Sequence, residues 1–186
     1  MIDDTRRDIA YFAYGTLQKG FQNWPDLADR LGDPIGRFRT VAPHALVVPL
    51  EPGCGNPGCR LLHRMAALVP GVDGFHVEGD LFMIDRATLA AVDRLEDYEP
   101  GRRPPGLYER VEVEVVALDR RRTVVAMAYR VREPARWRAL ATSGAAELLT
   151  QYVHDLARAE AKRCCRLHPG HDGPHDVVDP LASVRR

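Results

Sequence analysis

Two carboxylates lie on the apolar side of a predicted helix, where charged groups are uncommon. The segment Arg86–Asp97 has apolar residues at helical spacing. Glu96 comes four residues after Val92, so a helix turns its carboxylate toward the core together with Asp93. A carboxylate without water needs hydrogen-bond donors or a proton, and burial raises its pKa. A carboxyl group with a raised pKa suits proton transfer near neutral pH.

Other interpretations of these two carboxylates fit the same pattern. Glu96 could border the apolar stripe and pair with an arginine such as Arg94 or Arg110. Asp93 could form a structural hydrogen bond to a nearby loop. Helical spacing alone does not choose between these roles and proton transfer.

A second segment with chemical potential is Tyr14-Gly15-Thr16-Leu17, which follows a short apolar run and is followed by polar residues. Gly15 has no Cβ, so a ligand could approach the backbone at this point. The segment is compatible with a tight turn that buries Tyr14, and equally with a binding site built from backbone groups.

The chain has four cysteines, and in the cytosol metal binding or simple burial is favoured over disulfides. A loop rich in Gly and Pro and the tail at 164–186 together supply candidate ligands for a tetrahedral zinc ion. The candidates are Cys54, Cys59, Cys165, His171 and His175. His63, four residues after Cys59, is a further candidate. Such a zinc would be structural, and the alternative is that the cysteines are packed or free and the tail is mobile.

The elements that must position these residues follow from hydrophobic periodicity. Strands are predicted at 9–14, 45–48, 75–84, 111–115 and 123–131, and helices at 24–31, 86–97 and 145–163. Asp85 is a predicted N-cap, and Gly79 within its strand indicates a bulge or a close backbone approach. Irregularly interspersed strands and helices predict an α+β fold with a mixed, partly closed sheet. We expect one domain at 8–163 and a separate Cys/His-rich tail at 164–186.

Composition excludes several classes of function. Lys plus Arg and Asp plus Glu number 26 each, so the basic surplus of nucleic-acid binders is missing. No apolar run approaches the ~20 residues that cross a membrane. The N-terminal residues show no apolar leader, which predicts a cytoplasmic protein. Neither a G-x-G-x-x-G nor a P-loop is present, so no nucleotide or redox cofactor is expected.

Three motifs in order resemble the γ-glutamylcyclotransferase-like family, closest to its γ-glutamylamine cyclotransferase branch. The first is Tyr14-Gly15-Thr16-Leu17, which is similar to the substrate-binding turn of that family. The second is the segment 76–82, HVEGDLF, similar to its V-E-G strand. The third is the segment 89–96, which ends in Glu96, with Tyr108-Glu109-Arg110 after it. The resemblance covers about residues 10–131.

The resemblance implies a mixed, partly closed β-barrel with flanking helices. It also implies a cyclotransferase that acts on a small γ-glutamyl substrate and releases 5-oxoproline and a free amine, with no cofactor required for catalysis. Glu96 would then be catalytic, and backbone N–H groups of Tyr14, Gly15, Thr16 and Leu17 would hold the glutamyl end. Tyr108 would hydrogen-bond the substrate or the glutamate, unless it is a core aromatic with its hydroxyl at the rim.

A second hypothesis is a non-catalytic module that binds a small molecule or a protein, with the tail pinned by zinc. Neither hypothesis calls for nucleic acid or a membrane as a partner. The resemblance also leaves the amine leaving group open, because the loop at 54–59 and the tail are not part of the family pattern.

Overall fold

The structure is a computed structural model that describes residues 6–21, 23–52, 60–62, 66–119 and 122–152. Within these residues the helices are α1 Trp24–Leu31, α2 Arg86–Leu95 and α3 Pro134–Thr142. The strands are β1 Ile9–Ala13, β2 Gly36–Thr40, β3 His44–Pro52, β4 Arg60–Leu62, β5 Ala67–Pro70, β6 Glu78–Ile84, β7 Tyr108–Ala117, β8 Thr123–Val131 and β9 Ala146–Leu149.

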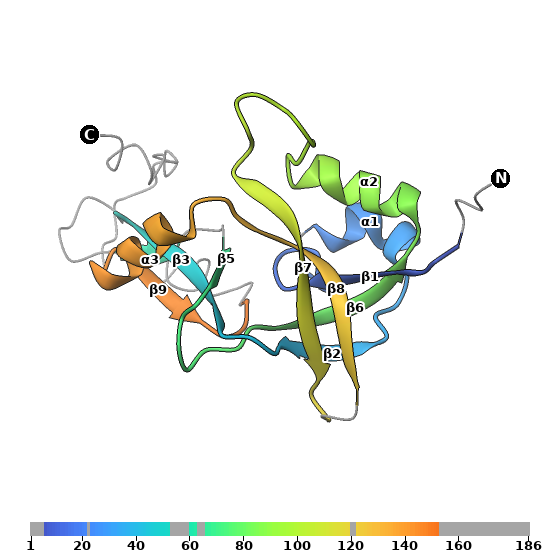
Figure 1. Ribbon diagram of the computed structural model, residues 1–186, viewed down its shortest axis with the longest axis horizontal. Helices are drawn as coiled ribbons and strands as arrows, with labels where there is room; N and C mark the ends of the chain where they lie inside the picture. The colour runs from blue at the N-terminus through green and yellow to red at the C-terminus, as the bar shows by residue number, and fades with distance from the viewer. Residues whose placement is uncertain (1–5, 22, 53–59, 63–65, 120–121, 153–186) are drawn as a thin grey trace, which may run out of the picture.

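Five strands form a closed barrel in the order β1-β6-β2-β7-β8 (Figure 1). Neighbouring strands are antiparallel, except where β8 meets β1 in parallel through Tyr11 and Met127. The predicted α+β fold with a mixed barrel and flanking helices is confirmed, and the barrel is closed. Closure leaves none of these five strands with an unpaired edge of the kind that invites aggregation.

A smaller sheet lies at one end of the barrel and contains β4, β3 and β5, with β9 also paired to β3 (Figure 1). Helix α3 packs on this sheet through Trp137, which is 1% exposed. After β9, the backbone N–H of Glu78 in β6 donates to the carbonyl of Thr150 at 2.8 Å. The chain thus returns from the small sheet to the barrel just before residue 152.

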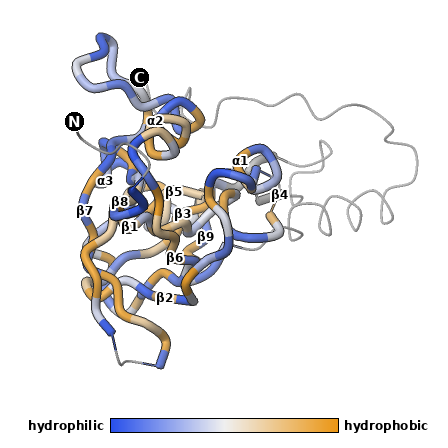
Figure 2. Tube along the Cα trace, turned by 90° about the vertical axis from the view of Figure 1, so that its right-hand side faces the viewer, coloured by the Kyte–Doolittle hydropathy of each residue, from blue (hydrophilic) through white to orange (hydrophobic). Residues whose placement is uncertain are grey.

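Alternation along the strands explains how the barrel is filled. Val113 and Val115 of β7 are buried, whereas Glu112 and Glu114 between and beside them are exposed. Apolar stretches accordingly follow the barrel strands in Figure 2, while the α2–β7 loop is hydrophilic. Inside the barrel a cluster gathers residues of every strand, including Phe12, Phe38, Leu81, Val113 and Ala126. A second cluster joins the outer face to α1 and α2.

Helix α2 begins and ends as the sequence predicts, to within two residues. The Asp85 carboxylate accepts the backbone N–H of Thr88 at 2.7 Å, which satisfies a donor that the first helical turn leaves free. Leu89 and Val92 are the buried face and pack in the cluster that contains Ile84 and Tyr129. The helix therefore lies against the barrel wall with its C-terminal end at Leu95 and Glu96.

The predicted helix at 145–163 is wrong over 146–149, where the chain is strand β9. Gly144, at φ +73°, turns the chain out of α3 and lets Ala146–Leu149 pair with β3. Pairing opposite the buried Val47 and Leu46 outweighs a local preference for helix. Residues 153–163 lie outside the described residues. Helix α3 and strands β2, β4 and β5 were not predicted, because each is short, and α3, β2 and β5 also contain or adjoin Pro or Gly.

Candidate functional site

Glu96 is the residue directly after α2, where the helix gives way to a tight turn. Its backbone N–H donates to the carbonyl of Val92 at 2.9 Å, and the N–H of Tyr98 donates to the carbonyl of Asp93 at 2.8 Å. Asp97, between them, has φ 50°, which lets the chain reverse direction. Glu96 is half-buried. The helix and its terminal turn therefore hold the carboxyl group against the barrel.

The Glu96 carboxyl has the electrostatic character that its predicted position implies. Burial raises its pKa from 4.5 to about 7. Among the residues that the structure describes, no hydrogen bond or ion pair to the carboxylate is formed. A group that titrates near neutral pH can both accept and return a proton there.

Four tyrosines surround this carboxyl group, and each senses its charge. Burial raises the pKa of Tyr11 and of Tyr108, and the negative charge of Glu96 raises both further. Burial likewise raises the pKa of Tyr14 and of Tyr129, with smaller contributions that include Glu96. All four phenols therefore keep their protons at neutral pH. They are hydrogen-bond donors and not bases.

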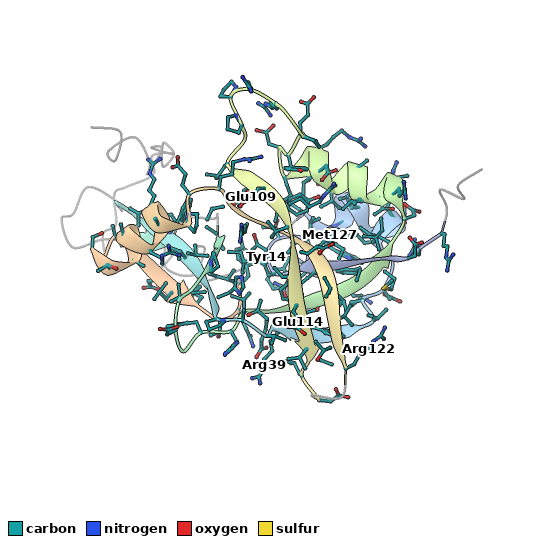
Figure 3. The ribbon with its side chains drawn as sticks, in the orientation of Figure 1. Tyr14, Arg39, Glu109, Glu114, Arg122 and Met127 are labelled. Atoms are coloured by element: carbon teal, nitrogen blue, oxygen red, sulfur yellow. The ribbon has the colours of Figure 1, made fainter. Side chains whose placement is uncertain are left out.

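These tyrosines come from three parts of the barrel. Tyr11 is in β1 and Tyr14 directly follows it, Tyr108 begins β7, and Tyr129 is in β8. The Tyr14 hydroxyl donates to the carbonyl of Tyr129 at 2.5 Å, which fixes its ring at the junction of β1 and β8. Figure 3 shows Tyr14 at the end of the barrel away from the β7–β8 tip, where Arg122 is drawn. The sequence predictions included Tyr14 and Tyr108 but missed Tyr11 and Tyr129.

The segment 14–17 is a turn whose carbonyl groups accept hydrogen bonds from neighbouring residues. Gln18, 2% exposed, donates through Nε2 to the carbonyls of Tyr14 at 3.0 Å and Gly15 at 3.3 Å. Asn23 donates from its backbone to the Thr16 carbonyl at 3.1 Å and from Nδ2 to the Thr16 hydroxyl at 2.9 Å. The turn is thus rigid before any ligand binds.

Asp80 of β6 holds the far side of the same turn. It is 6% exposed, accepts the backbone N–H of Lys19 at 2.9 Å and pairs with Arg37 at 3.3 Å. Arg37 also donates to the side-chain carbonyl of Gln18 at 2.6 Å. Strand β6 therefore positions the turn at 14–17 through the buried carboxylate of Asp80, although the strand and the turn are about sixty residues apart in sequence.

The backbone N–H groups of Gly15, Thr16 and Leu17 have no hydrogen-bond partner among the described residues. The bonds that hold this turn use its carbonyl groups, the Thr16 hydroxyl and N–H groups of later residues. A Cβ placed on Gly15 would meet no atom within 4 Å, so the space beside it is open. Leu17 is buried in the cluster that also holds Leu89 and Val92 of α2. Its side chain therefore ties this turn to the helix that carries Glu96.

Arg110 does not pair with Glu96, which was one alternative left by the sequence. Its Nη1 instead donates to both carboxylate oxygens of Asp93, at 2.9 and 2.6 Å. Asp93 also accepts the hydroxyl of Tyr129 at 2.6 Å. Among the described residues, the Asp93 carboxylate thus bonds to strands β7 and β8 and not to a loop, as one alternative had expected. Glu96 is left without a cation of its own among the described residues.

The predicted zinc ligands Cys54, Cys59, Cys165, His171 and His175, and the further candidate His63, lie outside the described residues. Within the part of the chain that the structure describes, no group of three or more His, Cys, Asp or Glu side chains could hold a metal ion. No helix in that part is long and apolar enough to cross a membrane. The zinc hypothesis stays a prediction.

Comparison with known proteins decides the family. The family described as gamma-glutamyl cyclotransferase, AIG2-like, matches residues 11–145. The chain belongs to this family. The match contains Glu96, Tyr108 and the turn at 14–17, whereas the tail at 164–186 lies beyond it. The sequence resemblance is confirmed, and the chain is an enzyme of the gamma-glutamyl cyclotransferase type.

One relative supports the family assignment, and one solved structure supports the fold. A protein of Drosophila melanogaster named "Putative gamma-glutamylcyclotransferase CG2811" is 28% identical over 135 residues, which are 71% of this chain and 75% of that protein. The crystal structure of an AIG2-like protein from Mus musculus is similar with a TM-score of 0.52 and 23% identity. That similarity covers 78% of this gamma-glutamyl cyclotransferase and 88% of the mouse protein, and it supports the fold.

Proposed function

We propose that this gamma-glutamyl cyclotransferase acts on small γ-glutamyl amines and releases 5-oxoproline and a free amine. In this reaction the α-amine of the substrate attacks its own γ-amide carbonyl and closes a five-membered ring. Because the nucleophile is already part of the substrate, the protein needs no covalent Ser or Cys intermediate. Its tasks are to hold the substrate folded and to move protons.

The turn at 14–17 is the proposed anchor for the glutamyl end. Three successive N–H groups that have no hydrogen-bond partner among the described residues, at Gly15, Thr16 and Leu17, are proposed to donate together to a carboxylate. The rigid contacts of Gln18, Asn23 and Asp80 support this role, because donors that are already oriented pay little entropy when the ligand binds.

Glu96 is the proposed general base and acid. As a carboxylate it takes a proton from the α-ammonium group, and the freed amine adds to the γ-carbonyl carbon. Glu96 returns that proton to the departing nitrogen as the C–N bond breaks. The ring nitrogen then loses its second proton through the same carboxylate to the released amine, which leaves as an ammonium ion, so Glu96 ends as the carboxylate. Protonated Tyr108, close enough to sense the Glu96 charge, can donate a hydrogen bond to the substrate or to Glu96.

One observation carries this proposal. A carboxyl group whose pKa burial raises to about 7 shares one end of the barrel with four protonated tyrosines and a turn of open N–H groups. Proton transfer at neutral pH needs such a group, whereas a surface that only binds a partner does not. The amine specificity, the structural zinc and the cytoplasmic location remain predictions from the sequence.

The test is a panel of γ-glutamyl amines, dipeptides and γ-glutamyl-ε-lysine, with 5-oxoproline measured by mass spectrometry. We expect turnover of at least one amine donor, and Glu96→Gln to lower kcat by about 10²- to 10⁴-fold. Glu112→Gln makes the same chemical change on the exposed face of β7 and should stay within about twofold of wild type. Full activity of Glu96→Gln would remove Glu96 from the mechanism. If no donor is turned over, the non-catalytic binding module becomes the better hypothesis.

A further inference from the structure

Arg110 contacts residues on both sides of Glu96. It forms the two hydrogen bonds to Asp93, three residues before Glu96, and its guanidinium lies over the ring of Tyr98, two residues after, at 5.2 Å from the ring centroid. The Asp93 and Arg110 side chains are 18% and 25% exposed, so their pairing is partly shielded from water. One arginine of β7 therefore clamps the turn that carries the candidate catalytic carboxyl.

Tyr129 of β8 contacts the same two residues. Its hydroxyl donates to Asp93 at 2.6 Å, and its ring meets the ring of Tyr98 edge-on at a centroid distance of 6.1 Å. Its carbonyl accepts the hydroxyl of Tyr14 at 2.5 Å. A continuous chain of contacts thus runs from Arg110 through Asp93 and Tyr129 to the start of the proposed substrate-binding turn.

The charges around Glu96 make the pairing of Asp93 with Arg110 consequential. Asp93 and Glu96 are three residues apart at the end of α2, a spacing that places two side chains next to each other on a helix. Arg110 contacts Asp93 and Tyr98, which flank Glu96 in the chain, so its guanidinium lies in the neighbourhood of that carboxyl group. Asp93 supplies the opposite charge that compensates Arg110 there. Among the described residues, the titratable and charged side chains near Glu96 include Tyr11 of β1, Tyr14, Asp93 of α2, Tyr108 and Arg110 of β7, and Tyr129 of β8, with Arg94, Asp97 and Tyr98 next to it in the chain.

We propose that Asp93 is a positioning residue that keeps the charge of Arg110 away from Glu96 while fixing Tyr129 and, through it, Tyr14. The proposal deepens the proposed function and rests on it. An uncompensated guanidinium beside a carboxyl favours its ionised form, which makes the carboxylate a weaker base. Asp93 thus allows Arg110 to hold the turn after α2 in place without lowering the basicity of the Glu96 carboxylate.

The test compares Asp93→Asn with the double variant Asp93→Asn plus Arg110→Gln. Asparagine keeps one oxygen that can accept the Tyr129 hydroxyl, removes the charge, and replaces the second oxygen that accepts from Arg110 with an amide NH2 group. The pKa of the Glu96 carboxyl is measured by NMR titration of protein labelled with ¹³C at glutamate carboxyls, with Glu96→Gln identifying the resonance. The kcat and KM of the best donor are measured across pH in parallel, and melting temperatures confirm that each variant folds.

We expect Asp93→Asn to lower the Glu96 pKa by about one unit, to move the acid limb of the kcat profile down equally, and to reduce the plateau kcat about tenfold. The double variant should bring the Glu96 pKa back to within a few tenths of the wild-type value. A Glu96 pKa that stays at its wild-type value in folded Asp93→Asn overturns the proposal, whatever the loss of activity. If the pKa moves but the double variant does not restore it, the charge of Arg110 is not the cause and the proposal is again wrong.

The titration needs no turnover, so it separates this proposal from the proposed function. Activity that survives in Glu96→Gln would refute the catalytic role of Glu96. The dependence of the Glu96 pKa on Asp93 would still be read directly from the NMR signal.

Discussion

At the scale of single residues, the site depends on the Glu96 carboxyl group, which lies near hydrogen-bonding side chains but forms no hydrogen bond or ion pair with any described residue. Arg110 donates to the Asp93 carboxylate. The Tyr14 hydroxyl donates to the carbonyl of Tyr129, and the Tyr129 hydroxyl donates to Asp93. Glu96 is left with burial as the cause of its raised pKa. The same residue is therefore a proton-transfer candidate and a source of instability when ionised.

The raised pKa predicts how activity depends on pH. The proposed base works as the carboxylate, so kcat/KM should fall about tenfold per unit below a pKa of about 7 and level off above it. The profile is measured from pH 5 to 9 with a saturating and a limiting donor concentration. An acid limb centred near 4.5 would contradict the burial of Glu96 in the working enzyme.

Stability should follow the opposite trend. The folded state binds this proton more tightly than the unfolded chain, so the stabilisation is complete below about pH 4.5 and lost as pH rises through about 7. Between pH 5 and 8, wild type should therefore lose about 2 kcal/mol of unfolding free energy relative to Glu96→Gln. Urea unfolding of both proteins at the two pH values measures the difference, and parallel losses would contradict it.

At the scale of elements, strand β6 joins the barrel to the turn. It pairs with β1 on one side and β2 on the other, and its Asp80 holds Lys19 and Arg37. Its Gly79 passes so close to β1 that a Cβ would lie 2.3 Å from the carbonyl oxygen of Ala13. The close approach expected at Gly79 from the sequence is confirmed, because a residue with a Cβ could not lie this close to the backbone of β1.

Two alanine substitutions separate the roles of two motif glycines. Gly79→Ala should lower the unfolding free energy by about 1–3 kcal/mol, because its Cβ pushes β6 off β1. Gly15→Ala meets open space and should leave stability nearly unchanged, while it raises KM about tenfold by crowding the proposed glutamyl site. Thermal unfolding and steady-state kinetics of both variants test this. Equal stability losses would contradict the packing argument.

At the scale of the whole molecule, the barrel and the small sheet are joined by the chain that leaves β9. Thr150 bonds to Glu78, the Gln151 side chain donates to the Glu78 carboxylate, and the ring of Tyr152 lies 5.7 Å from that of Phe21. The electrostatic contribution of Tyr152 to the pKa of Tyr108 places it near the candidate site. A residue far beyond the third motif therefore comes close to that site.

Deletion of 164–186 tests the predicted domain boundary and the zinc hypothesis together. The five barrel strands and the core cluster inside them consist of described residues that precede this tail in the sequence. The shortened protein should keep its kcat/KM within about twofold and its melting temperature within a few degrees. Zinc content is measured by mass spectrometry in both forms. A melting temperature that falls steeply with loss of one zinc per chain would show that the tail is pinned by metal.

Local sequence determined much of this protein. Helix 24–31 and the start of α2 follow from periodicity, Pro25 and the Asp85 cap, because their signals lie within one or two turns. Strand β8 matches its predicted bounds, since alternation is also local. The motif residues Tyr14, Gly79 and Glu96 could be singled out from the sequence alone, because each departs from the local pattern. Tyr14 ends an apolar run before a glycine, Gly79 lies inside a predicted strand, and Glu96 lies on the apolar side of a predicted helix.

Tertiary structure alone decided the rest, because those choices depend on partners far away in sequence. Residues 146–149 have apolar residues at helical spacing, but they form a strand because they pair with β3 through backbone hydrogen bonds. Arg110 could equally have paired with Glu96, and only the placement of β7 beside the preceding turn of α2 gave it to Asp93. Closure of β8 on β1 brought Tyr129 to Tyr14 across 115 residues. Contact energies between such distant groups leave no trace in local periodicity, so no pattern in the sequence could reveal them.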